Sequence, residues 1–134
     1  MLNTLPIIVY CTYFLVVDII WIQTFVLPTY QAALQTPFRT LSSPQDVAIA
    51  LFVYALLLVG NLIFGDMRQT PNDLPSMIMY GGLFGLVVYG VYTGTNYVVF
   101  PQWSTYLVIT DTLWGAFLCS SSLAVLYVTR MLIA

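Results

Sequence analysis

The stretch YGVYTGTNYVVFPQWSTYLVITDTLWG, residues 89–115, decides the fold. One apolar segment ends in it and carries Tyr92 and Asn96. An aromatic turn with a proline follows, and a second apolar segment then carries Asp111 and Trp114. Polar side chains inside long apolar runs are costly, and most of those in this chain gather here. The stretch therefore predicts two membrane helices joined by a tight turn, with a polar cluster near their joined ends.

The composition is that of an integral membrane protein. Of 134 residues, 60% are hydrophobic and 6% are charged, whereas roughly 25% of the residues in soluble domains are charged. The chain contains no Lys, Glu or His, and its net charge is −2. Neither a polybasic surface for nucleic acid nor a His-containing metal site is therefore expected. The lipid bilayer is the expected surrounding, and no cofactor or metal is expected.

The two cysteines, Cys11 and Cys119, both lie in apolar runs. A disulfide framework or a zinc site needs more cysteines or a histidine, so both are expected to be small buried hydrophobes. The first four residues contain no Lys or Arg, unlike the basic start of a signal peptide. The first apolar run is therefore expected to be a retained span.

Four apolar runs are long enough to cross a bilayer as helices, since a helix rises about 1.5 Å per residue and the hydrocarbon core is about 30 Å thick. Pro28 is expected to end the first of them, because proline interrupts helical hydrogen bonding. Short connections predict an all-α fold, an integral membrane four-helix antiparallel bundle with residues 1–134 as a single transmembrane domain. The spans are expected at about residues 5–27, 47–64, 77–97 and 106–130.

Two helix starts have recognisable signals. Ser43, Pro44 and Asp46 supply a cap, a proline in the first turn and a carboxylate near the helix N-terminus, which together are typical of a helix start. Asp73 is expected to cap the third span.

The arginines bear on the orientation. An antiparallel bundle of four spans places both termini on one face of the membrane, together with Arg68 and Arg130, whereas Arg39 lies on the opposite face. The positive-inside rule then favours cytoplasmic termini by a single residue. The identity of the membrane stays open.

Small residues recur at helical spacing in the third and fourth spans. Glycines four residues apart let helix backbones approach closely in lipid, so the third span is expected to be the central helix of the bundle. The residues expected to pack helices together are Gly81, Gly85, Gly90, Gly94, Ala116 and Ser120.

A polar cluster is expected in one half of the bilayer, formed by Asp18, Trp21, Tyr92, Asn96, Asp111 and Trp114. An aspartate at the centre of a span costs roughly 2.5–3.5 kcal/mol. The first and fourth spans share the pattern Asp-x-x-Trp and run in opposite directions. An antiparallel pairing would set Asp18 beside the Trp114 indole and Asp111 beside Trp21, so that each carboxyl accepts an indole N–H.

Three interpretations of the two aspartates stay open. In the first, they only form hydrogen bonds that hold helices together. In the second, they form a site for a proton or a solute, since intramembrane carboxyls exchange protons. In the third, they are a catalytic pair. No flanking signature identifies a catalytic pair, and the serines that follow Cys119 have no base, so no catalytic residue is assigned.

The runs YFLVVDIIW (residues 13–21), GLFGLVVYGVYTGTN (residues 82–96) and DTLWG (residues 111–115), together with Trp103, resemble a family of small predicted four-helix membrane proteins, domain-of-unknown-function family 2177. The resemblance covers nearly the whole chain and implies a four-span fold but no activity. The family pattern has an aspartate at the position that Thr93 occupies here.

Three functions follow as hypotheses. The first is a non-catalytic accessory subunit that packs through its spans into a larger membrane assembly, with other membrane subunits or copies of itself as partners. The alternative is a carrier or channel for a proton or a small solute that uses Asp18 and Asp111. A membrane enzyme that modifies lipid is third, and it would need a polar cavity open to the lipid headgroups.

Overall fold

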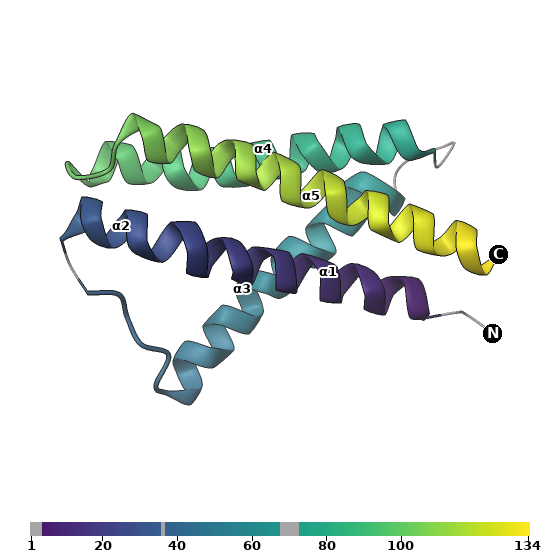
Figure 1. Ribbon diagram of the computed structural model, residues 1–134, viewed down its shortest axis with the longest axis horizontal. Helices are drawn as coiled ribbons and strands as arrows, with labels where there is room; N and C mark the ends of the chain where they lie inside the picture. Colours follow the sequence, from purple (N-terminus) through teal and green to yellow (C-terminus); the bar gives the residue numbers. More distant parts are fainter. Residues whose placement is uncertain (1–3, 36, 68–72) are drawn as a thin grey trace.

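A computed structural model describes residues 4–35, 37–67 and 73–134. The described residues contain no strand, and four of their helical runs are long and apolar enough to cross a membrane. This confirms an all-α, multi-pass membrane bundle (Figure 1). The elements are α1 (Leu5–Trp21), η1 (Ile22–Val26), α2 (Leu27–Leu34), α3 (Pro44–Leu62), η2 (Ile63–Met67), α4 (Leu74–Val99) and α5 (Thr105–Ile133).

The sequence predicts that the first helix ends at Pro28, and this prediction is wrong. The helix continues through the π-helical turn η1 and through α2 to Leu34, which makes one helical run of 30 residues. A widened turn relaxes the hydrogen-bond ladder just before the proline, so Pro28 sits in the first turn of α2, where a missing N–H is tolerated. The run ends at Gln35, whose φ of 52° is left-handed.

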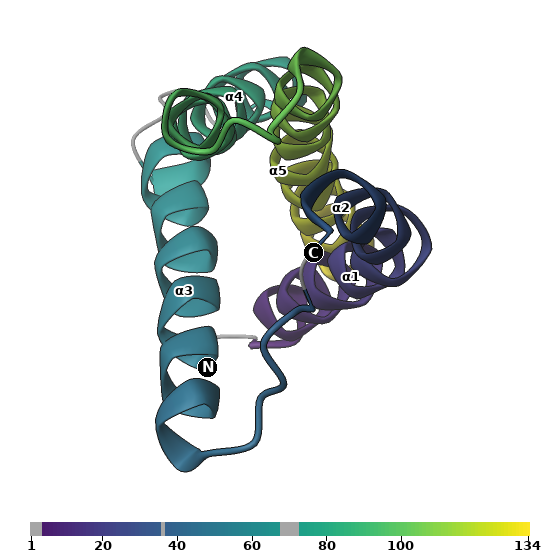
Figure 2. The ribbon, with the colours of Figure 1, turned by 90° about the vertical axis from the view of Figure 1, so that its left-hand side faces the viewer.

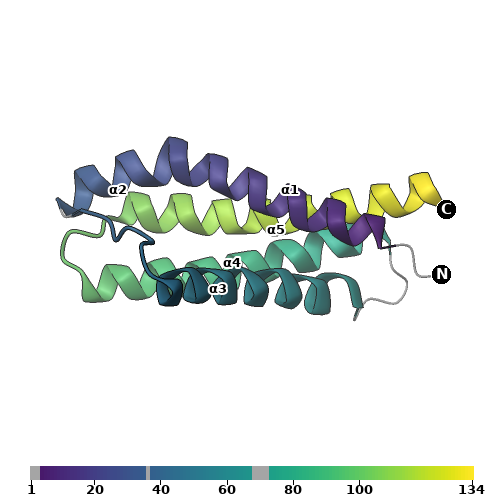
Figure 3. The same ribbon diagram turned by 90° about the horizontal axis from the view of Figure 1, so that it is seen from below.

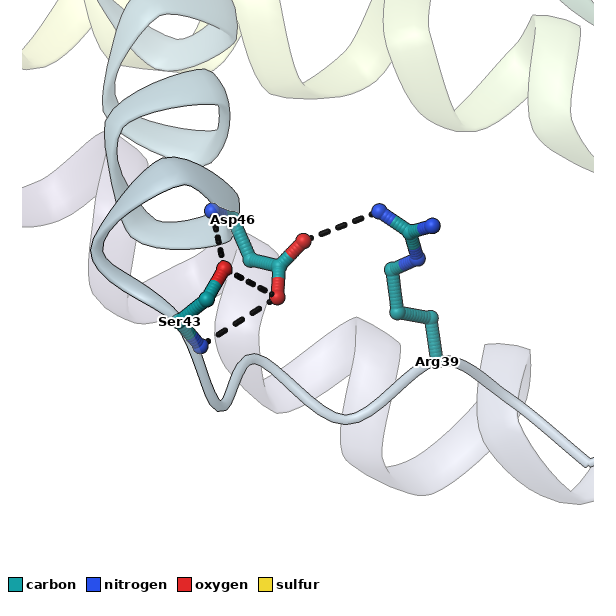
Figure 4. Close-up of polar contacts among 3 residues, drawn as sticks. All are labelled: Arg39, Ser43 and Asp46. Carbon is teal, nitrogen blue, oxygen red and sulfur yellow. Dashed lines mark hydrogen bonds and ion pairs between the residues drawn. The ribbon is translucent and has the colours of Figure 1, made fainter.

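The start of α3 has the cap that the sequence predicts (Figure 4). Ser43 Oγ accepts the Asp46 backbone N–H at 3.1 Å, and Asp46 Oδ2 accepts the Ser43 backbone N–H at 3.3 Å. Arg39 donates to the other oxygen of Asp46 at 2.9 Å. The reciprocal pair satisfies two N–H groups that a helix start leaves without partners, and Arg39 ties the preceding connection to it.

Asp73 caps α4, as the sequence predicts. Its carboxyl accepts the Ser76 backbone N–H at 2.8 Å. This hydrogen bond holds the pKa of Asp73 below its ordinary value, because it favours the ionised carboxylate.

The helices α4 and α5 lie side by side as an antiparallel pair, and α1 with α2 packs along α5 (Figures 1 and 3). The helix α3 crosses the others at an angle, and its first half diverges from them (Figure 1). In the view of Figure 2 the helices α3 and α2 stand on opposite sides, with α4 and α5 joining them. The start of α1 and the end of α5 lie at the same end of the bundle (Figure 1).

Glycines set the closest approach of α4 to α5. A Cβ added at Gly85 would lie 2.0 Å from the Gly115 carbonyl oxygen, and one at Gly81 would lie 2.6 Å from Leu123 Cδ1. At Gly90 the nearest atoms of Thr112 are at ordinary contact distance, and at Gly94 nothing lies within 4 Å. The two glycine pairs expected to pack helices therefore differ: a Cβ would clash with α5 at Gly81 and Gly85 but not at Gly90 or Gly94.

The small residues expected on α5 face the same contact. A Cβ added at Gly82 would lie 3.8 Å from Ser120 Cβ and 3.9 Å from the Ala116 carbonyl oxygen. These distances are ordinary van der Waals contacts. Ser120 thus lies opposite α4 at ordinary contact distance, whereas the Ala116 backbone nitrogen also belongs to the tight contact, 3.0 Å from a Cβ added at Gly85.

An ion pair joins α5 to η2 at the end of the bundle that contains the termini. Arg130 donates to both carboxyl oxygens of Asp66, at 2.6 and 2.8 Å. A guanidinium matches a carboxylate in this two-point geometry. Arg130 therefore fastens the end of α5 to the end of the second span.

Polar groups also hold α1, α3 and α5 together in the core. The Asn61 amide nitrogen donates to the Tyr10 hydroxyl, the Cys119 carbonyl and Ser122 Oγ, and Tyr10 donates to the Leu58 carbonyl at 3.0 Å. In lipid, such bonds contribute to helix association where the hydrophobic effect does not. Cys119 is fully buried and Cys11 is half-buried.

Candidate functional site

A cavity of about 520 Å³ lies among all four helical runs. The cavity is partly open. The residues that α3 contributes to its wall are three and four positions apart, so they lie on a single face of that helix. Aromatic and aliphatic side chains make up nearly all of its surface. The lining residues are Asp18, Trp21, Ile22, Val26, Tyr30, Ala50, Val53, Tyr54, Leu57, Val88, Tyr89, Tyr92, Asp111 and Trp114.

Asp18 joins three helices at this cavity. Its Oδ2 accepts the Tyr54 hydroxyl of α3 at 2.7 Å, and its Oδ1 accepts the Trp114 indole N–H of α5 at 3.0 Å. The carboxyl is only 6% exposed. An indole N–H can only donate, so the Asp18 oxygen that faces it serves as an acceptor. The predicted pairing of Asp18 with Trp114 is thus present in the structure.

Asp111 forms the second polar centre, and it is 4% exposed. Its Oδ2 accepts a hydrogen bond from the Tyr30 hydroxyl of α2, and the Thr93 hydroxyl of α4 also interacts with this carboxyl. Thr93 Oγ1 in turn accepts the Trp103 indole N–H at 2.9 Å. A chain of polar groups therefore runs from the turn between α4 and α5 to the cavity wall.

The predicted pairing of Asp111 with Trp21 is wrong. The Trp21 ring instead stacks on Trp114, with centroids 4.3 Å apart and planes 5° from parallel, and on Phe25. The reason is the length of the first helix. Because it continues past Pro28, it brings Tyr30 to the Asp111 carboxyl.

Five of the six residues expected in the polar cluster line the cavity, and Asn96 is the exception. Asn96 lies one turn beyond Tyr92 on α4 and interacts with its hydroxyl. Tyr92 packs edge-on against Trp103, with ring centroids 6.2 Å apart. Asn96 thus belongs to the surroundings of the site and not to its wall.

Three further tyrosines belong to the site, and two of them, Tyr54 and Tyr30, were not predicted from the sequence. Tyr54 and Tyr30 donate to the two aspartates. Tyr89 packs against Gly115, where an added Cβ would lie 2.3 Å from the ring. Tyr54 interrupts the aliphatic run of the second span with a hydroxyl, a signal in the sequence that could have identified it.

Thr93 is fully buried beside Asp111. This is the position at which the family pattern implies an aspartate. The fold would therefore bring a carboxyl at that position together with Asp111, whereas this chain supplies a hydroxyl that interacts with Asp111 instead.

The arrangement can bind by hydrogen bonds, charge and aromatic contact. Within the described parts of the chain, no three residues of the kinds that bind metals lie together. The two aspartates and the aromatic rings are therefore the groups that define the chemistry of the site.

The sequence profile of a family described as "Predicted membrane protein (DUF2177)" matches residues 3–128. Neither a curated protein nor a solved structure matches the chain.

Proposed function

The chain belongs to this family of predicted membrane proteins, DUF2177, and we propose that it is a carrier that binds a small membrane-soluble molecule in the cavity of Asp18 and Asp111. The observation that supports the proposal is the cavity itself, about 520 Å³ with both carboxyls on its wall. Cavities of roughly 300–1,000 Å³ that are mostly apolar, with a few polar groups, are typical of sites for small ligands.

The energetics of the site favour a binding role over packing alone. Each intramembrane aspartate costs roughly 2.5–3.5 kcal/mol, and space left unfilled beside it forfeits dispersion contacts. If the aspartates served only to join helices, apolar residues that fill this space would stabilise the bundle more. A molecule that occupies the cavity restores the dispersion contacts and can interact with the two carboxyls.

The position of α3 supports entry from the bilayer. Ala50, Val53 and Leu57 face the cavity, while the start of α3 diverges from α2 (Figures 1 and 2). A hydrophobic molecule dissolved in the membrane can approach the cavity from this side.

The hypothesis of an accessory subunit has its own support. Asp18 hydrogen-bonds to α3 and α5, and Asp111 to α2, so both carboxyls also join helices. Native mass spectrometry of the protein extracted gently from its own membrane separates the two hypotheses. A carrier retains a small molecule, whereas an accessory subunit co-purifies stoichiometrically with other chains.

A pair of variants makes this experiment specific for the cavity. Ala50→Trp places a large ring in the cavity, and we expect it to lose the bound small molecule. Ala48→Trp changes an exposed residue of the same helix and should keep it. Stoichiometric partner chains without any bound small molecule in the unaltered protein would contradict the carrier.

We also propose that the chain termini face the cytoplasm. The support is the order of the arginines in the sequence: the antiparallel topology assigns Arg130 and Arg68, which lies outside the described residues, to the face of the termini, and Arg39 to the opposite face. A fluorescent reporter protein fused after Ala134 that folds and fluoresces only in the cytoplasm tests this orientation, and a dark fusion with normal membrane insertion would contradict it.

A further inference from the structure

We infer that the molecule bound in this cavity is an organic cation with an apolar body, such as a hydrophobic amine or a quaternary ammonium or phosphonium ion. The inference rests on the proposed function and specifies the substrate class of the same site. Three features of the cavity carry it: carboxyls without a cationic partner among the described residues, aromatic faces and an aliphatic wall.

The first feature is the missing positive charge. The donors to Asp18 are a phenol and an indole, and Asp111 receives a phenol and interacts with a threonine hydroxyl. All of these groups are neutral. A buried carboxylate is costly unless a cation accompanies it, so a cationic ligand is the complement that these carboxyls lack.

The protein's own cations are used elsewhere. The chain contains three arginines and no Lys or His. Of the two that the structure describes, Arg39 pairs with Asp46 and Arg130 with Asp66, both at ends of the bundle. Arg68 lies outside the described residues. Within the described part of the chain, no cation therefore neutralises the aspartates of the cavity.

The second feature is the aromatic wall. Trp21 and Trp114 stack in parallel at 4.3 Å and both line the cavity, and Tyr54, Tyr89 and Tyr92 line it as well. The face of an aromatic ring attracts cations, and the attraction grows when water is excluded. Because the Trp21 ring is stacked on both Trp114 and Phe25, Trp114 and the tyrosines provide the faces for such contacts. Because Asp18 accepts the Trp114 indole N–H, which lies in the plane of the ring, the carboxyl adjoins the edge of an aromatic group of this wall.

The third feature selects against small inorganic ions. Val26, Val53 and Leu57 belong to the same wall, and they offer only dispersion contacts. A hydrated metal ion or ammonium ion would leave this surface unused. A cation with hydrocarbon groups fills it, and such an ion also dissolves in the bilayer from which the cavity is reached.

The experiment compares two ions of nearly the same size and shape but opposite charge. Radiolabelled tetraphenylphosphonium and tetraphenylborate are each equilibrated by dialysis with the purified protein in a neutral maltoside detergent, with empty micelles as the blank. We expect saturable binding of the phosphonium ion and an affinity about tenfold or more higher than that of the borate. Equal binding of both ions, or stronger binding of the borate, would overturn the inference.

Variants locate the binding. Asp18→Asn and Asp111→Asn should each lower the phosphonium affinity about tenfold or more. Asp73→Asn, which removes a carboxyl outside the cavity and keeps a good helix cap, should leave it unchanged. If the cavity variants fail to fold, Ala50→Trp tests the site without touching a carboxyl, and phosphonium binding that survives Ala50→Trp would overturn the inference.

The outcome also separates this inference from the proposed function. Suppose that native mass spectrometry finds a retained neutral molecule and that dialysis finds no preference for the phosphonium ion. This result would be consistent with the carrier function and would contradict the inference that its substrate is a cation. Absence of any retained molecule and of any binding of either ion would contradict both.

Discussion

Asp18 Oδ1 accepts a hydrogen bond from the Trp114 indole N–H at 3.0 Å, which joins the first membrane span to the fourth in the wall of the cavity. The same indole ring stacks on Trp21. Trp114 thus both donates to the carboxyl and stacks on a neighbouring ring, so a change at this residue acts on polar and apolar contacts together.

The two tryptophans are expected to differ in their contribution to stability. Trp114→Phe keeps a ring but removes the donor to buried Asp18, which should cost about 1–3 kcal/mol. Trp21→Phe removes no donor to either aspartate and should cost less. Thermal unfolding in detergent, followed by circular dichroism, measures both, and equal losses of stability would show that the hydrogen bond contributes nothing.

The contact between Gly85 and Gly115 should tolerate no side chain. Gly85→Ala would place a Cβ 2.0 Å from a backbone oxygen, so α4 and α5 would have to separate, at a cost of about 1–3 kcal/mol or more. Gly94→Ala meets nothing within 4 Å and should be neutral or slightly stabilising, since alanine favours helix. Similar unfolding of the two variants would contradict this packing.

The two described ion pairs should differ in how much they contribute to stability. Arg130→Lys removes the two-point contact with Asp66, whose side chain is 7% exposed, and we expect a loss of about 1–3 kcal/mol, reduced by the partial exposure of Arg130. Arg39→Lys alters a pair in which the arginine is 78% exposed and should change stability by about 0–1 kcal/mol. Unfolding by titration with sodium dodecyl sulfate ranks them, and the reverse order would refute the expectation.

The continuation of the first helix past Pro28 can be tested through Tyr30. Tyr30→Phe removes the hydroxyl that donates to buried Asp111, so the free energy of unfolding should fall by about 1–3 kcal/mol. Tyr106→Phe changes a tyrosine that is exposed on α5 and serves as the control. A Tyr30→Phe variant as stable as the control would mean that α2 does not reach Asp111.

The cap of α4 should make stability depend on pH. Hydrogen bonding from Ser76 lowers the pKa of Asp73 in the folded protein, so the folded state binds this proton less readily than the unfolded state. The stabilisation is therefore present above the ordinary pKa of an aspartate, about 3.9, and is lost as the pH falls through the lowered value. Asp73→Asn should remove this component from the pH dependence of the melting temperature. An unchanged profile would show that the cap does not titrate.

The sequence by itself determined the membrane bundle and its local helix starts. Lengths of apolar sequence are sufficient for this, because a chain in lipid must satisfy its backbone hydrogen bonds internally and a helix is the simplest way to do so. The cap of α3 by Ser43 and Asp46 and the cap of α4 by Asp73 were predictable for a similar reason, since they depend on residues within one turn of each other.

Only the tertiary structure decided which side chains meet at the site. The repeated Asp-x-x-Trp pattern predicted two equivalent pairs, and one of them, Asp18 with Trp114, is present. The other is replaced by Asp111 with Tyr30, because a π-helical turn carries the first helix past Pro28. Contacts between helices depend on the rotation and axial position of each helix, which small changes in a single turn alter. The cavity likewise depends on how the helices pack, since its wall combines residues from all four helical runs.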